Sequence, residues 1–141
     1  MTNPYAKVSQ AYAQDSVLTA SPEKLVVMLY DGLARFLARG AAAIRAEDIG
    51  AAGTALQRAG AILDELLATL DPAAGEMSER LSGIYLFCKR ELLAAQIKRD
   101  PKRIERVAKL LGELRESWAA IAEAPPAMPG ARPTLGAGAT A

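Results

Sequence analysis

Apolar residues recur at intervals of three and four along most of the chain, which is the spacing of one face of an α-helix. Short breaks that carry Asp, Pro or Gly divide the pattern into four segments. We predict helices over residues 22–46, 49–70, 75–99 and 101–123, with Ser21, Asp48 and Asp100 as caps. Amphipathic helices joined by such short turns pack beside one another in opposite directions. The pattern therefore predicts an all-α fold, an antiparallel four-helix bundle that occupies residues 19–123.

Capping signals mark the helix starts. Ser21 can accept a hydrogen bond from the free N–H groups of a helix start, and Pro22 has no N–H to leave unpaired there. Asp48 is a good cap for the second helix. The pair Asp100-Pro101 is a strong start signal for the fourth helix.

The first helix is expected to turn one apolar stripe toward the core. The stripe contains Leu25, Leu29, Leu33, Phe36, Leu37 and Ile44. Gly32 and Gly40 interrupt the helix, at a cost of about 1 kcal/mol each relative to Ala. We expect these glycines to allow the close approach of another backbone. Cys88 lies on the stripe of the third helix, which predicts a buried and unreactive thiol.

Two segments carry more apolar surface than a simple bundle needs. Six apolar residues follow one another without a break from Leu25 to Tyr30, so this part of the helix is apolar on every side. The run is too short to span a bilayer. On the third helix, Tyr85, Leu86 and Leu93 widen the apolar face. This surplus predicts a surface that a partner covers.

The two ends of the chain differ from the bundle. Residues 1–18 are predicted to form an arm whose Tyr5, Val8 and Tyr12 share one face of a short helix. A helix of that length is marginal by itself, so we expect the arm to dock elsewhere. Residues 124–141 are mostly Pro, Gly, Ala and Thr, which predicts a disordered tail.

Composition narrows the possible chemistry. The chain has 17 basic and 16 acidic residues, no His and one Cys. No basic stripe with interleaved aromatics is evident in the sequence, so a nucleic-acid partner is not expected. Without His, catalytic triads of the Ser-His-Asp type and His-based di-iron sites are excluded, and zinc ligands are lacking. We expect no cofactor and no metal. A single Cys, with neither a secretory signal nor a membrane-inserted segment, predicts a cytoplasmic protein.

The motif from Thr19 to Leu25, followed by Met28 to Gly32, closely resembles the signature of FliS, the flagellin-specific export chaperone. Matches at ordinary bundle positions extend the resemblance over residues 4–122. One departure is Ala74-Gly75, where the family usually has two glycines, so the turn before the third helix could differ. The resemblance implies a non-enzymatic cytoplasmic bundle. Such proteins bind the C-terminal segment of flagellin, keep it from polymerising and help to bring it to the export gate component FlhA.

The resemblance and the apolar surplus together locate a hypothetical site. We expect the flagellin segment to lie as a helix in a groove, and the residues expected to line it are Leu25, Met28, Leu29, Tyr30, Leu33 and Tyr85. The arm with Tyr5, Val8 and Tyr12 is expected to lie over this groove beside Met28 and Leu29. Client binding would displace the arm, and the family implies a gate contact by the aromatic that matches Tyr12 and by an apolar residue whose place falls near Val8 or Ser9.

Two alternatives remain at this point. A small all-α mutase would bind an anionic substrate between helices, with Arg35, Arg39, Arg58, Lys89 and Arg90 as candidates. A structural bundle would use its apolar surface only to associate with itself. The chaperone hypothesis expects a monomer or a weak homodimer when the protein is free.

Overall fold

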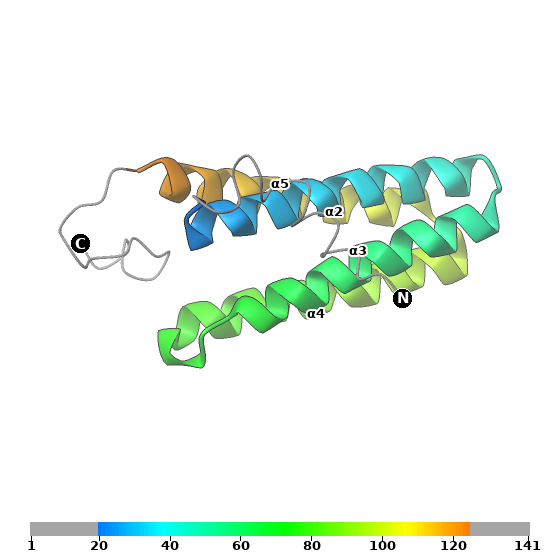
Figure 1. Ribbon diagram of the computed structural model, residues 1–141. Coiled ribbons are helices and arrows are strands. Elements are labelled where there is room, and N and C mark those ends of the chain that lie inside the picture. Colours follow the sequence, from blue (N-terminus) through cyan, green and yellow to red (C-terminus); the bar gives the residue numbers. More distant parts are fainter. Residues whose placement is uncertain (1–19, 125–141) are drawn as a thin grey trace, which may run out of the picture.

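The computed structural model describes residues 20–124, which form four long helices and one short 3-10 turn (Figure 1). The elements are α2 (Pro22–Arg45), α3 (Ile49–Thr69), η2 (Pro72–Ala74), α4 (Glu76–Lys98) and α5 (Pro101–Glu123). The predicted all-α fold is confirmed, and the predicted helix ends agree with the observed ones to within about one residue. The predicted arm lies outside the described residues, as does the predicted tail after Ala124.

The helix starts follow the capping signals. The Ser21 hydroxyl accepts a hydrogen bond of 3.1 Å from the Lys24 N–H, and the Asp48 carboxylate accepts one of 3.0 Å from the Ala51 N–H. Asp100 caps α5 through the Lys102 N–H, also at 3.0 Å. Each side chain satisfies a donor that the helix itself cannot pair, and this fixes the first turn.

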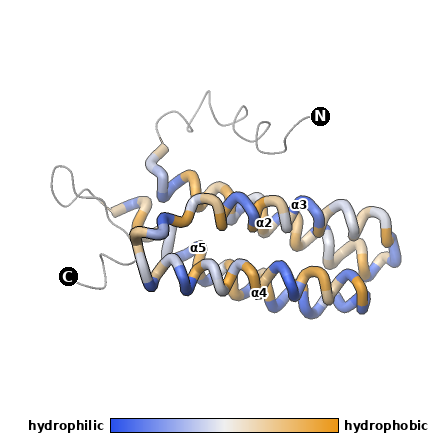
Figure 2. Tube along the Cα trace, turned by 90° about the horizontal axis from the view of Figure 1, so that it is seen from below, coloured by the Kyte–Doolittle hydropathy of each residue, from blue (hydrophilic) through white to orange (hydrophobic). Residues whose placement is uncertain are grey.

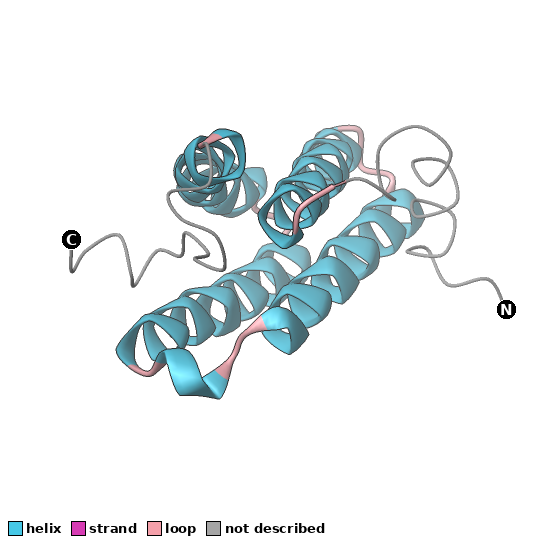
Figure 3. Cartoon of the chain, turned by 60° about the vertical axis from the view of Figure 1, so that its left-hand side comes forward, coloured by secondary structure: helices cyan, strands magenta, loops and turns pink. Residues whose placement is uncertain are grey.

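The helices pack in opposite directions around one core. In Figure 1, α2 and α5 lie together along the upper side of the molecule, and α3 and α4 lie along the lower side. Figure 3 shows the four helices closer to end-on, with the turns at the ends of the bundle. The contacts of α2 with α3 and α5 are more extensive than those between α3 and α4. Apolar and polar residues alternate around each helix in Figure 2.

The first turns of α2 differ from the predicted stripe. Leu25 is 38% exposed, and Leu29 and Phe36 are only half-buried, whereas Val26 and Tyr30 face the core. The prediction is therefore wrong at Leu25, whereas Leu29 and Phe36 pack against the core from its edge and Leu33, Leu37 and Ile44 are buried as expected. The physical reason is that residues 25–30 are all apolar, so their pattern does not fix which side faces inward. Packing against both α3 and α5 decides it.

The two glycines of α2 accommodate side chains of α3. A Cβ atom on Gly40 would lie 2.9 Å from Leu56 Cδ2, and one on Gly32 would lie 3.4 Å from Ile62 Cδ1. The predicted close approach of another backbone is therefore wrong, because the groups that lie against these glycines are side chains, chiefly those of Leu56 and Ile62.

A buried hydrogen bond between two tyrosines connects α2 and α4. The hydroxyl oxygens of Tyr30 and Tyr85 lie 2.6 Å apart, and both side chains are almost completely buried. Burial raises the pKa of both hydroxyls above the ordinary value for tyrosine, and at Tyr30 the neighbouring Tyr85 raises it further. Both groups therefore stay neutral, and each one satisfies the other inside the core.

Changing Tyr30 to Phe is expected to destabilise the bundle by about 1–3 kcal/mol, because the Tyr85 hydroxyl is left buried without a partner. The double change Tyr30→Phe with Tyr85→Phe should cost less than twice that amount, since neither hydroxyl is then left without the other; the buried Trp118 indole N–H has no hydrogen-bond partner among the described residues in either case. Urea denaturation of the three variants measures this coupling. Additive losses would show that the two hydroxyls do not depend on each other.

Candidate functional site

The six residues predicted to line a groove are divided between surface and core. Tyr30, Leu33 and Tyr85 are core residues with at most 2% of their surface exposed, so the structure corrects the prediction at these three positions. Leu25 is exposed, and Met28 and Leu29 are half-buried on the first two turns of α2. The phase of α2 and the Tyr30–Tyr85 hydrogen bond explain the difference, because both tyrosines point into the bundle.

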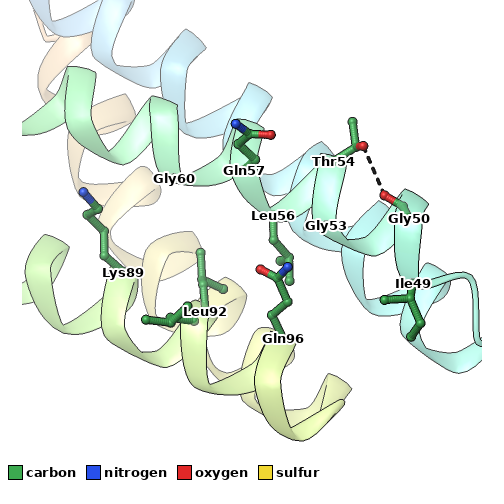
Figure 4. A pocket seen from close by; sticks show the side chains of 11 residues that line it. Ile49, Gly50, Gly53, Thr54, Leu56, Gln57, Gly60, Lys89, Leu92 and Gln96 are labelled. Carbon is green, nitrogen blue, oxygen red and sulfur yellow. Dashed lines mark hydrogen bonds between the residues drawn. The ribbon is translucent and has the colours of Figure 1, made fainter.

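An open groove lies between α3 and α4, with a volume of about 560 Å³. Leu56 and Leu92 form its buried floor, and in Figure 4 the side chains of Leu56, Leu92 and Gln96 point into the space between the helices. Ile49 and Leu93, both exposed, line its edges. The groove thus has an apolar floor and amphipathic edges, which is the surface that an amphipathic helix can cover.

Glycines on α3 give the groove its depth. Gly50, Gly53 and Gly60 all line it. A Cβ atom added to Gly60 would meet nothing within 4 Å, so the space above it is open. Each glycine inside a helix costs about 1 kcal/mol relative to Ala. At Gly60 the backbone is therefore bare and a partner can approach it closely, whereas the Gln96 amide lies over Gly53, 3.4 Å from where a Cβ atom would be.

The wall of the groove on α4 continues as a stripe of exposed apolar side chains. Leu86, Leu93 and Ile97 are 43%, 59% and 71% exposed, and their spacing of seven and four residues places them on one face of α4. The predicted widening of the apolar face is therefore confirmed for Leu86 and Leu93, whereas Tyr85 is buried. Ile49 and Ile97 were absent from the sequence prediction. Periodicity from Leu86 could have found Ile97, but nothing local identifies Ile49.

An ion pair crosses between α3 and α4 beside the groove, and a second hollow lies further along the same two helices. The Lys89 ammonium pairs with the Asp64 carboxylate across α3 and α4, and both side chains are partly exposed. The second hollow has a volume of about 430 Å³ and is lined by residues that include Leu67, Leu70 and Pro72. Exposed ion pairs contribute little stability, so this bridge can open at small cost. We call the groove, the ion pair and the second hollow the α3–α4 seam.

The polar groups of the described residues do not assemble a reaction centre. Of the arginines considered for anion binding, Arg39 and Arg58 lie over the Phe36 ring, with 5.4 and 5.9 Å from guanidinium carbon to ring centroid. Arg35 and Arg90 are exposed, and Lys89 is paired with Asp64. These cations therefore do not converge on a cavity. Within residues 20–124 no group of three or more His, Cys, Asp or Glu residues could hold a metal ion.

The only cysteine is a core residue. Cys88 is completely buried, and burial raises the pKa of its thiol to about 11. A thiol with that pKa is almost fully protonated near neutral pH, and the thiolate is the reactive form. The predicted inert thiol agrees with this position. Among the described helices, none has the length and apolarity needed to cross a membrane.

Comparison with known proteins gives a consistent result. The family model described as "Flagellar protein FliS" matches residues 2–125. A flagellar secretion chaperone FliS of Campylobacter jejuni is 39% identical, over 77% of this chain and 85% of the relative. The protein of the same name from Salmonella typhimurium is 38% identical, over 83% and 86%, and that from Bacillus subtilis is 34% identical, over 82% and 84%.

A solved structure shares the fold. The crystal structure of a bacterial flagellar chaperone superposes with a TM-score of 0.67, covering 83% of this chain and 96% of the other, at 19% sequence identity. At that identity the likeness concerns the arrangement of the helices alone. The sequence relatives are named chaperones, which is a non-enzymatic role.

Proposed function

Because the chain belongs to the FliS family of flagellar proteins, we propose that it binds the C-terminal segment of flagellin in the cytosol. In this proposal it prevents premature polymerisation of flagellin and assists export through the flagellar type III secretion apparatus. The observation that carries the proposal is the apolar groove of the α3–α4 seam, in a chain whose relatives are named secretion chaperones. The mutase alternative lacks a cavity on which its cations converge.

The groove suits an amphipathic client. A flagellin end that adheres to its own copies must present an apolar face, and a chaperone keeps it monomeric by covering that face. The floor at Leu56 and Leu92 and the exposed Leu93 offer a matching surface. Burial of apolar area contributes about 25 cal/mol per Å². Ordering a flexible client costs about 2–5 kcal/mol or more, so the client needs a long contact.

A second apolar patch extends the proposed contact. Leu25, Met28 and Leu29 lie at the start of α2, away from the α3–α4 groove. A client that wraps around the bundle in more than one segment could cover both surfaces and bury enough area to offset its own ordering. We propose these three residues, and not the buried Tyr30, Leu33 and Tyr85, as the part of α2 that the client contacts.

The arm completes the proposed mechanism, although residues 1–18 lie outside the described range. Tyr5, Val8 and Tyr12 would cover the apolar patch beside Met28 and Leu29 until the client replaces them. The released arm would then be available to the export gate component FlhA. A client can shift this equilibrium only if it binds the open state better than the closed one.

Titration of the full chain with a flagellin C-terminal segment tests the proposed function. We expect one client per chain, a Kd of about 1 μM or lower, and a negative heat-capacity change from apolar burial. The chain should also block polymerisation of purified flagellin at equimolar concentration. Calorimetry and gel filtration give these quantities. A dimer that ignores the client would overturn the proposal and would support the self-associating bundle instead.

A further inference from the structure

Positive charge is concentrated around the turn between α4 and α5. Residues 98–109 contain six of the 17 basic residues of the chain but only two of its 16 acidic residues. The rest of the chain therefore has more acidic than basic residues, even though the net charge of the whole is +1. This turn lies at the right-hand end of the bundle in Figure 1, where α4 ends and α5 begins.

Both acidic residues of this stretch are already engaged. Glu105 accepts two hydrogen bonds from Arg45, at 2.8 and 2.9 Å, and this pairing lowers the pKa of the Glu105 carboxyl. Asp100 caps α5 and pairs with Arg103 at 3.5 Å. Arg103 also pairs with Glu91 at 3.2 Å. Lys102 lies within Coulombic range of Glu105 but shares no hydrogen bond with it.

Five exposed cations remain without an ion-pair partner inside residues 20–124, and we call them the basic face. They are Lys98, Arg99, Lys102, Arg106 and Lys109. On α5, Lys102, Arg106 and Lys109 are spaced four and three residues apart, so they share one outward face over about 10 Å. Glu113 and Glu116 follow on the next turns and end the positive stretch.

Two of these cations lie where local preferences disfavour them, whereas Lys98 lies in the last turn of α4, where a cation is favoured. The first turn of α2 contains Glu23 and that of α4 contains Glu76 and Glu79, as the positive end of a helix dipole favours. The first turn of α5 has no acidic residue and instead contains Lys102. Arg99 has φ 53°, a left-handed conformation that favours Gly. Neither side chain gains an ion pair within the described residues in return, so both charges are available to a partner.

The basic face begins where the groove ends. Ile49 and Gln96 line that end of the groove, and Lys98 and Arg99 follow Gln96 within three residues. A segment that fills the groove and continues past its end therefore meets these cations, and then the outward face of α5. A groove with an apolar floor that leads into a short run of positive charge fits a polypeptide with an amphipathic segment next to an acidic one.

We propose that the basic face binds an acidic stretch of the same polypeptide whose amphipathic segment occupies the groove. This rests on the proposed function. A nucleic acid fits less well, because no aromatic side chain lies among residues 98–109 for bases to stack on. An anionic membrane lying along α5 would be repelled by Glu113, whereas Glu116 is paired with Arg115 at 3.2 Å. A contact of this kind contributes chiefly to association rate and orientation, and salt screens it.

Three synthetic clients test the proposal with the full chain. One is the flagellin C-terminal segment alone. The second carries four added Glu residues at its N-terminus, and the third carries them at its C-terminus. We expect one of the two extensions, and only one, to tighten binding about tenfold at 50 mM salt, with no gain left at 500 mM. The active end identifies the direction of the client. An extension of four Gln residues serves as the uncharged control.

Variants of the basic face locate the effect. Lys102→Glu with Lys109→Glu should abolish the gain from added Glu residues while the unextended segment binds within about twofold of the original affinity. Arg39→Glu with Arg80→Glu changes the net charge equally at positions away from the basic face and should keep the gain. Arg99→Gly should reduce the gain while keeping or raising the thermal midpoint, because Gly suits the left-handed backbone there.

The failures of the two proposals are distinguishable. If no client binds at all, the proposed function is wrong. If all clients bind with equal affinity and equal salt dependence, the proposed binding of flagellin in the groove is retained, and the proposal that the basic face binds an acidic stretch is wrong. Loss of binding to anionic lipid vesicles in the Lys102→Glu, Lys109→Glu variant, with no effect of added Glu residues, would assign the face to a membrane and overturn the proposal.

Discussion

Changing Gly60 to Leu is expected to weaken binding of the flagellin segment about 5- to 150-fold while the bundle stays folded. The leucine side chain would project into the groove of the α3–α4 seam, where the space above Gly60 is open. A client helix would then be overpacked, at a cost of about 1–3 kcal/mol. Replacing Gly inside a helix also favours folding by up to about 1 kcal/mol. Stability and binding should therefore change in opposite directions.

Gly112 provides a matched control for this substitution. It is an exposed glycine inside α5, a Cβ atom there would also meet nothing within 4 Å, and it does not line the α3–α4 groove. Gly112→Leu should give a similar rise in the urea midpoint with unchanged client affinity. Calorimetric titration of both variants with the flagellin segment compares their affinities. Equal affinities for the two variants would mean that the client does not lie over Gly60.

Changing Leu33 to Ala is expected to lower the free energy of unfolding by about 2–5 kcal/mol, which is a large part of the total for a bundle of this size. Leu33 is completely buried between helices, and truncation leaves a cavity. Leu25→Ala, on the same helix, should cost less than about 1 kcal/mol because Leu25 is 38% exposed. Urea unfolding followed by circular dichroism compares the two.

The sequence assigned both leucines to one inward stripe, so this pair tests the observed phase of α2. Similar losses for the two variants would show that the first turns of α2 pack as the sequence pattern suggested. A large difference would agree with Val26 and Tyr30, rather than Leu25, facing the core. The Leu25→Ala variant should also lose some client affinity, whereas Leu33→Ala should affect the client only through folding.

The helix boundaries were predictable because their causes are local. The hydrogen bonds from Lys24 N–H to Ser21 and from Lys102 N–H to Asp100 span two or three residues, so the sequence already contains both partners. Heptad-like repeats placed Leu63 and Leu111 in the core for the same reason. The exposed Leu86 and Leu93 were predictable because α4 has more apolar positions than one inward face can hold.

The lining of the candidate site was less predictable. Tyr30 and Tyr85 were assigned to a surface, yet 55 residues of sequence separate two hydroxyls that satisfy one another in the core. No local pattern encodes that pairing. The glycines that deepen the groove, Gly53 and Gly60, give no periodic signal because they have no side chain to count.

By itself, then, the sequence determined that the chain forms helices and where each helix starts and stops. It also determined that some apolar surface is left over. These three features follow from hydrogen bonds and periodicities within a few helical turns. Only the tertiary structure decided which surface that is. The extensive packing of α2 against α3 and α5 buries Tyr30, and the looser packing of α3 against α4 leaves a groove open at Leu93. Distances between helices depend on side chains far apart in the chain, which no local pattern records.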